Sequence, residues 1–282
     1  AFLSSTPPFQ NAMAMDANRC GIPVVYGFCR GVGSGSYAAA VLLLGFVLER
    51  HAPTLLLPVF AALTACGLIA MSGFRLPERP DEAADRPAEH RSIAAVLRSH
   101  PRFALTLLGC MFFFLTHTIS NTYMNALVGK AGGTASAVGT SLAISAVLEL
   151  PAMTLVSRLQ KRFSPGFFLR FAAGAEVVKF LIFYLARSMP LIYLGQCMQF
   201  FQFAVYAPAT VYYVAAALPE RDQLKGQSLI YVAGSGLGGA LGNLLGGRLL
   251  DRSGIQAALL LGTVSAAASL LTFCLSTRED SR

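Results

Sequence analysis

The chain has 282 residues and a formal net charge of +8, yet only 13% of its residues are charged, 55% are hydrophobic and its mean hydropathy is +0.58. Soluble domains carry about 25% charged residues, so this composition excludes an ordinary soluble protein. The basic residues are spread over separate segments instead of forming one solvated face, which also excludes a nucleic-acid-binding surface.

Between the clustered charges lie uncharged runs that are long enough to cross a membrane as helices, which takes about 18 or more residues. Residues 1–15 look like the end of one such span. These runs are continuous and do not alternate, which excludes a membrane β-barrel. The sequence predicts an all-α polytopic membrane protein with eight complete spans, at 23–48, 53–73, 103–128, 136–157, 167–187, 190–217, 227–250 and 254–275.

One connection is long: segment 74–102 is rich in proline and charge, so we expect a solvated linker, with a short surface helix at "SIAAVLRS" (92–99). Lys and Arg favour the cytoplasmic side of a membrane. Placing the linker there puts 16 of them on that side and 5 on the other. The sequence therefore predicts a multi-pass protein of the cell inner membrane, the plasma (cytoplasmic) membrane, with the tail 277–282 also cytoplasmic and residues 129–134 outside.

The six cysteines follow neither metal-ligand nor disulfide spacing, and the sequence contains no HExxH, phosphate-loop or GxSxG motif. We therefore expect no enzymatic activity, no cofactor and no bound metal. The expected partners are the lipid bilayer and a small-molecule solute, with a proton as an open choice of coupling ion and no nucleic acid. The protein is expected to be a monomer.

Two glycine-rich segments resemble each other: "GSGSYAAAVLLLGFVLER" at 33–50 and "GSGLGGALGNLLGGRLLDR" at 234–252. Their first glycines are 201 residues, or six spans, apart. Parallel repeats of this size are typical of transporters with two six-helix halves, and small residues let membrane helices pack closely. Chance similarity is the alternative. The same offset puts the start of the first half about 100 residues before Ala1, so we predict that three further spans precede this chain.

These features resemble the major facilitator superfamily, in the branch of lactose permease and related oligosaccharide or nucleoside:proton symporters. "YGFCRGVGSGSY" at 26–37 resembles the fifth helix of that branch, "PPFQNAM" at 7–13 the end of its fourth, and "AVLELPAM" at 146–153 its eighth. The resemblance implies two six-helix bundles, here helices four (in part) to twelve. Helices four to six then occupy 1–73, the linker 74–102, and the C-terminal bundle 103–276.

The resemblance also implies a sugar site. Arg30 matches an arginine that binds sugar hydroxyls on helix five, and Glu149 matches a main sugar ligand on helix eight. Snorkelling to the cytoplasmic headgroups is the alternative role for Arg30. Ser34 and Tyr37 match positions that line the site on helix five. Asn11 falls beside a carboxylate position on helix four.

Lys179 matches an arginine on helix nine. On helix ten, Gln196, Gln199 and Gln202 stand where the permease has a Lys, a His and a Glu that serve proton coupling. Amides do not exchange a proton near neutral pH. The sequence therefore places proton coupling through these three positions in question.

The residues themselves also point to a site. An ionisable side chain inside a span costs several kcal/mol and marks a function by default, and Glu149 lies 13 residues, roughly 20 Å, into its span. Glu176 and Lys179 are one helical turn apart and could neutralise each other, for coupling or as a purely structural pair. Two polar stripes have helical spacing: His117, Asn121 and Asn125, and Gln196, Gln199, Gln202 and Tyr206.

We predict that the two stripes line a shared wet cavity; a packed hydrogen-bond seam is the alternative. The function predicted is secondary active transport of a small polar solute, such as a sugar or nucleoside, by alternating access. A solute sensor on the same scaffold and an inactive fragment are the alternatives. The candidate solute-binding residues are Asn11, Arg30, Ser34, Tyr37, His117, Asn121, Glu149, Gln199 and Gln202, with Glu176 and Lys179 as a coupling or charge pair.

Overall fold

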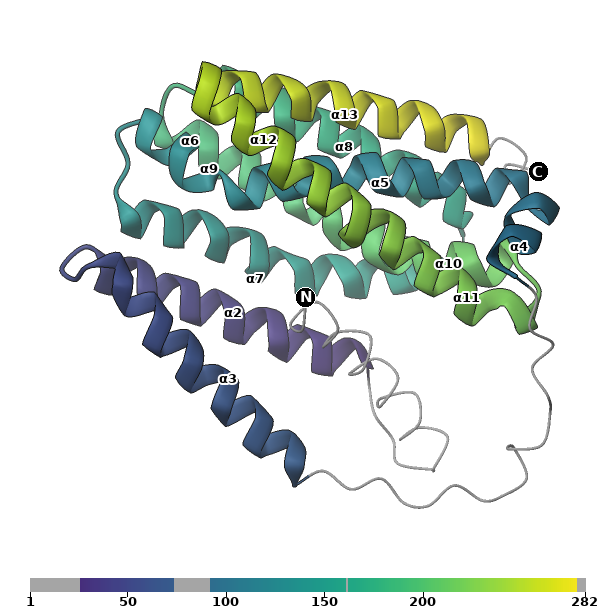
Figure 1. Ribbon diagram of the computed structural model, residues 1–282, viewed down its shortest axis with the longest axis horizontal. Helices are drawn as coiled ribbons and strands as arrows, with labels where there is room; N and C mark the ends of the chain where they lie inside the picture. The colour runs from purple at the N-terminus through teal and green to yellow at the C-terminus, as the bar shows by residue number, and fades with distance from the viewer. Residues whose placement is uncertain (1–25, 74–91, 161, 278–282) are drawn as a thin grey trace.

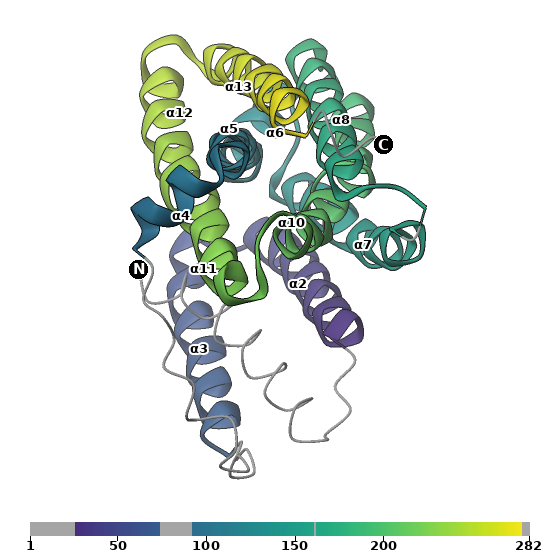
Figure 2. The same ribbon diagram turned by 90° about the vertical axis from the view of Figure 1, so that its right-hand side faces the viewer.

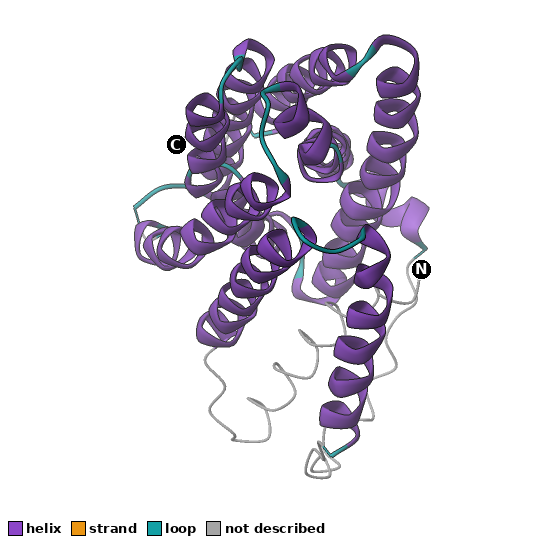
Figure 3. Cartoon of the chain, turned by 90° about the vertical axis from the view of Figure 1, so that its left-hand side faces the viewer, coloured by secondary structure: helices purple, strands orange, loops and turns teal. Residues whose placement is uncertain are grey.

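The computed structural model describes residues 26–73, 92–160 and 162–277. Every regular element in these ranges is a helix (Figure 3), which confirms the predicted all-α class. Asn11 and the other residues before 26, most of the predicted linker and the last five residues lie outside the described part.

The helices follow the predicted spans. Six described helical segments are long and apolar enough to cross a membrane. The two other predicted spans correspond to α2, whose apolar part is Val32–Leu48, and to α8, which carries three charged residues within 21. The elements are α2 (Tyr26–Leu48), η2 (Pro53–Leu55), α3 (Leu56–Ser72), α4 (Ile93–Ser99), α5 (Pro101–Thr122), α6 (Met124–Lys130), α7 (Ala135–Leu159), α8 (Pro165–Leu185), α9 (Met189–Cys197), η4 (Met198–Phe200), α10 (Phe203–Ala217), α11 (Glu220–Tyr231), the π-helix η5 (Val232–Gly238), α12 (Gly239–Ser253) and α13 (Ile255–Ser276).

Helix α4 confirms the predicted short helix before the C-terminal bundle. The Ser92 hydroxyl caps it by accepting a 3.2 Å hydrogen bond from the backbone N–H of Ala95, which satisfies one of the free donors at a helix start. The next helix begins directly at Pro101, a residue that suits the first turn because that turn needs no N–H donor there.

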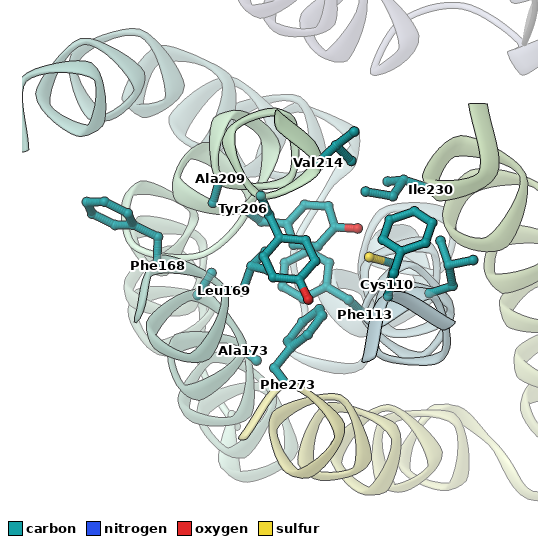
Figure 4. Close-up of a cluster of buried hydrophobic side chains, with 14 of the residues drawn as sticks. Cys110, Phe113, Phe168, Leu169, Ala173, Tyr206, Ala209, Val214, Ile230 and Phe273 are labelled. Atoms are coloured by element: carbon teal, nitrogen blue, oxygen red, sulfur yellow. The ribbon is translucent and has the colours of Figure 1, made fainter. Parts of the chain in front are cut away.

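The helices from α5 to α13 form one bundle, which Figure 2 shows nearly end-on. Helix α5 packs against α12 and α13, α13 also packs against α8, and α10 lies between α8 and α7. A cluster of buried aromatic side chains joins α5, α8, α10 and α13 (Figure 4). At its centre the rings of Phe113 and Tyr206 stack with centroids 3.9 Å apart.

Helix α2 packs along α7, whereas α3 lies apart from the bundle in Figure 1 and none of its apolar span is buried. The close approach of α2 and α7 is at Gly45 and Gly139: a Cβ on Gly139 would lie 3.1 Å from Gly45 Cα. Among the described residues, no neighbouring atom lies within 4 Å of a Cβ placed on Gly33 or Gly35. The glycine contact of this helix therefore lies at Gly45, near the end of the glycine-rich segment 33–50, and not at its first glycines.

A polar contact lies beyond this glycine pair. The Thr134 hydroxyl donates a 2.6 Å hydrogen bond to the Glu49 carboxylate, just after the end of α2. Hydrogen bonds from the side chains of Ser136 and Thr134 hold the pKa of Glu49 below its ordinary value. The connection after α2 is thereby tied to the start of α7.

The second glycine-rich segment, 234–252, packs closely against a neighbouring helix, as its small residues predict. Gly234, Gly238, Gly242 and Gly246 recur every four residues through η5 and α12 and face α5. A Cβ on Gly242 would lie 2.6 Å from the Leu115 carbonyl oxygen, and one on Gly246 would lie 2.6 Å from the Tyr123 ring. The two helices can be this close because these positions carry no side chain.

We expect Gly242→Ala to destabilise the bundle by about 1–3 kcal/mol, since the added methyl group meets backbone that cannot rotate away. The matched control is Gly174→Ala in α8, where a Cβ would have no neighbour within 4 Å. That change should be neutral or stabilising by roughly 0.5–1 kcal/mol, because alanine is the better helix former. Thermal unfolding of both variants in detergent measures the difference. Equal melting temperatures would show that the α5–α12 contact tolerates a wider spacing.

Candidate functional site

The span predicted as one helix over 190–217 is broken. Helix α9 ends at Cys197, one 3-10 turn follows, and α10 begins at Phe203. Gln202 has a non-helical backbone (φ −102°, ψ −93°), and its carbonyl oxygen accepts the first hydrogen bond of the new helix, from Tyr206 N–H at 2.9 Å. Irregular backbone at membrane depth is tolerated only where it is buried in protein or lines a cavity. The break corrects the prediction of a continuous helix.

The first glutamine of this break lies between a cation and an anion. The Lys179 ammonium donates a 2.9 Å hydrogen bond to Gln199 Oε1, and Gln199 Nε2 donates a 3.1 Å bond to Glu149 Oε1. The second carboxylate oxygen, Oε2, accepts a 3.1 Å bond from the Ser34 hydroxyl. One amide therefore bridges α8 and α7, and the carboxylate carries the chain of bonds on to α2.

The second glutamine joins a different carboxylate. Gln202 Nε2 donates a 3.1 Å hydrogen bond to Glu176 Oε1 and lies 3.5 Å from His117 Nδ1. On the other side of the imidazole, Asn121 Nδ2 is 3.0 Å from His117 Nε2. The imidazole also stacks on Phe203, with ring centroids 4.3 Å apart. The two predicted polar stripes meet at this contact between α5 and the break.

Burial divides the predicted site residues into two groups. Four are almost completely buried: Gln199, Gln202, Glu176 and Lys179, at 3%, 0%, 0% and 1% exposed. Ser34, His117 and Glu149 are half-buried, and Tyr37 and Asn121 are exposed. The second group retains solvent-accessible surface, and two of its members, Glu149 and His117, contact the buried glutamines Gln199 and Gln202.

Glu176 and Lys179 do not contact each other directly. Among the described side chains no ion pair within 4.0 Å joins them, and each bonds a glutamine of the broken helix instead. The Lys179 ammonium lies 5.6 Å from the centre of the Phe183 ring, one turn further along α8. The two side chains therefore form no ion pair at contact distance and each bonds an amide, but their charges still attract each other one turn apart on α8.

Two predicted positions have no described contacts. Arg30 lies within α2, but its side chain is outside the description, as is the whole of Asn11. Conversely, the sequence reasoning missed the two aromatic partners, Phe183 and Phe203. Phe183 had a signal, since it follows Lys179 by four residues, which places both on one helix face. Phe203 had none, because its approach to His117 depends on how α5 and α10 pack.

Among the described residues, no group of three His, Cys, Asp or Glu side chains is arranged to hold a metal ion. What the site does offer is hydrogen-bonding capacity: a carboxylate, an imidazole, a hydroxyl and amides. Such groups bind hydroxyl-bearing molecules without covalent chemistry.

Comparison with known proteins places the chain among transporters. The model of the MFS_1 like family matches residues 5–261. The maltose permease of Geobacillus stearothermophilus is 28% identical over 257 residues, which cover 90% of this chain and 64% of that protein. The chain thus spans less than two thirds of that relative.

Two solved structures have the same fold at low sequence identity. An asparagine-to-alanine variant of the E. coli fucose:proton symporter FucP aligns over 82% of this chain and 60% of its own, with a TM-score of 0.56 and 19% identity. A bacterial homologue of the human lysosomal transporter Spinster, inward-facing and unoccupied, aligns over 96% and 71%, with a TM-score of 0.55 and 17% identity.

Proposed function

Because the chain belongs to the MFS_1 like family of major facilitator superfamily transporters, we propose that it moves a small, uncharged, hydroxyl-rich solute across the membrane by alternating access. A sugar or a nucleoside fits this description. The observation that carries the proposal is the position of Glu149, a half-buried carboxylate at the contact of α2 and α7.

The Ser34–Glu149 hydrogen bond crosses between the two predicted bundles, because α2 belongs to the first and α7 to the second. A solute hydroxyl can take the place of the Ser34 hydroxyl as donor to Glu149 Oε2. Gln199 meanwhile keeps Oε1 in position from the buried side. A site that exchanges an interbundle contact for a solute contact couples binding to separation of the bundles.

The accessible side chains favour a neutral polar solute. Tyr37 exposes 51% of its surface and offers a flat ring to the face of a sugar, and Asn121 adds an exposed amide. Lys179 is buried and directed at Gln199, so among the described residues it is not available to a solute anion. The names of two relatives, a maltose permease and a fucose:proton symporter, support a sugar as the first choice.

The arrangement of α2 and α7 supports a state closed on the predicted outer side. Their glycine contact and the Thr134–Glu49 hydrogen bond both lie towards that end, and the Ser34–Glu149 hydrogen bond lies nearer the predicted cytoplasmic end. Opening to the outside then requires these two outer contacts to break. This is the rocking motion of two-bundle transporters.

Uptake into proteoliposomes tests the proposal. Labelled maltose, L-fucose and uridine are each offered to vesicles that contain the protein and to empty vesicles. We expect saturable uptake of one of the three and competition by the unlabelled compound. Binding without uptake, measured by calorimetry on the same preparation, would support the sensor on this scaffold. If none of the three compounds is bound or taken up, the result would contradict a sugar or nucleoside solute.

A further inference from the structure

The hydrogen-bonded side chains around the broken helix form a polar cluster of Glu149, Glu176, Lys179, Gln199, Gln202 and His117. Glu176 is the carboxyl of this cluster that the solute site does not use. We propose that Glu176 is the proton-binding residue of this protein, with a proton on its Oε2 atom donated to Oε1 of Gln202. The proposal deepens the proposed function, since it names the group that exchanges the coupling ion beside the solute site. Protonation of a side chain can be measured without any solute, so the two proposals can fail separately.

Two unpaired acceptors carry the argument. Among the described buried side chains, Glu176 Oε2 and Gln202 Oε1 have no hydrogen-bond partner, although these two side chains already share the bond from Gln202 Nε2 to Glu176 Oε1. Both unpaired atoms are acceptors when the carboxyl is ionised, so neither can satisfy the other. Buried polar atoms without partners are costly and rare.

A single added proton satisfies both atoms. A protonated carboxyl has one donor and one acceptor, and a primary amide has the same pair in the complementary order. In the proposed neutral form, the two groups close a ring with two hydrogen bonds: the existing one from N–H to Glu176 Oε1, and a new one from O–H to Gln202 Oε1. Gln202 is thus suited to bind the neutral form of this carboxyl.

The charges of the neighbouring side chains independently favour a neutral Glu176. The described residues of the cluster include one cation, Lys179, and two carboxyls, Glu149 and Glu176. Gln199 connects the cation to Glu149 by hydrogen bonds at both ends of its amide. An ionised Glu176 would then be a second anion, 0% exposed, that shares the one described cation, Lys179, with Glu149 and forms no ion pair with it within 4.0 Å. Burying an unpaired charge is far more costly than burying a neutral carboxyl.

The other titratable groups around Glu176 come from the elements packed against α8. Lys179 is on α8 itself, His117 on α5 reaches it through Gln202, and Glu149 on α7 is two hydrogen bonds beyond Lys179. On α10 the Tyr206 side chain is buried, and its hydroxyl interacts with the Cys110 thiol of α5. The remaining titratable side chains of α9, α10 and α13 are Tyr193, Cys197, Tyr212, Tyr213 and Cys274.

The proposed step is the exchange of one proton between Glu176 and water. The neutral carboxyl of Glu176 releases one proton to water on the side to which the site is open and becomes a carboxylate; it takes one proton back from the other side. The Lys179–Gln199–Glu149 chain stays intact through both steps. The replacement of three titratable positions by Gln196, Gln199 and Gln202 is therefore compatible with proton coupling, which moves to the neighbouring helix.

Infrared difference spectroscopy of the protein in lipid tests this directly. The wild type, titrated from acid to alkaline pH, should lose the carbonyl stretch of a protonated carboxyl. Glu176→Gln should lack this band from the start, because its amide forms the same ring without a titratable proton. Asp251→Asn, which changes an exposed carboxylate on α12, is the control and should keep the band. A band that persists in Glu176→Gln, or that disappears in Asp251→Asn, would overturn the proposal.

Two further measurements test the Glu176–Gln202 ring and the coupling role of Glu176 separately. Gln202→Leu removes the amide partner, so the band should move to the frequency of a carboxyl without a hydrogen bond; an unmoved band would contradict the Glu176–Gln202 ring even if Glu176→Gln does not fold. In proteoliposomes, Glu176→Gln should retain maltose counterflow, which needs no net proton movement, and lose accumulation driven by a pH gradient. Retained accumulation would exclude Glu176 as the coupling residue.

Discussion

Replacing Glu149 by glutamine is expected to weaken solute binding roughly ten- to a hundredfold while the protein still folds. The glutamine can keep its oxygen towards Gln199 and turn its amide nitrogen to the Ser34 hydroxyl, so both present contacts survive. What is lost is the charge. Hydrogen bonds to charged groups contribute about 1.5–3 kcal/mol, and each 1.4 kcal/mol corresponds to about tenfold in affinity.

Calorimetric titration with the sugar or nucleoside found by the uptake panel measures this effect. The matched control is Asp251→Asn, which makes the same kind of change at an exposed carboxylate on α12, away from the cluster. It should leave affinity unchanged. Unaltered affinity in Glu149→Gln, with a normal melting temperature, would remove this carboxylate from the solute site.

Replacing Gln199 by leucine is expected to lower the stability of the bundle strongly, by about 3–5 kcal/mol. Lys179 would lose its hydrogen-bond acceptor and its connection to Glu149, which leaves a buried cation without compensation. The leucine has almost the volume of the glutamine, so a packing defect contributes little. The readout is thermal or denaturant-induced unfolding of the protein in micelles.

Gln196→Leu is the control for this change. Gln196 lies one turn earlier in the same span and is equally buried, at 1% exposed, but its described hydrogen bond is a weak one to the sulfur of Met124 at 3.7 Å. A leucine there should be neutral or mildly stabilising, because a poorly satisfied buried amide is removed. Similar losses in both variants would mean that the amide bridge at Gln199 has no special role.

The extent and order of the helices were determined by the sequence alone. A membrane span is a local property, set by the length of an uncharged run, and so most predicted limits from 103 onwards agree with the helices within a few residues. The exceptions are 103–128, where α5 ends at Thr122 and α6 follows, and 227–250, where the helix begins at Glu220. The capping serine before α4 is local as well, since a hydroxyl and an N–H three residues apart suffice. The same holds for the ionisable residues inside the spans: Glu149 and Lys179 were identified because an apolar span does not need them.

The tertiary structure decided which of these groups meet. Glu176 and Lys179 are one turn apart, which favours a direct pair, but the glutamines of the broken helix offer each a separate hydrogen bond. The sequence has no glycine or proline between 197 and 203 that would predict this break. Likewise, Gly45 touches α7 while Gly33 does not, because the point where two helices cross depends on both helices. Contacts between residues far apart in sequence are set by packing, which local patterns do not encode.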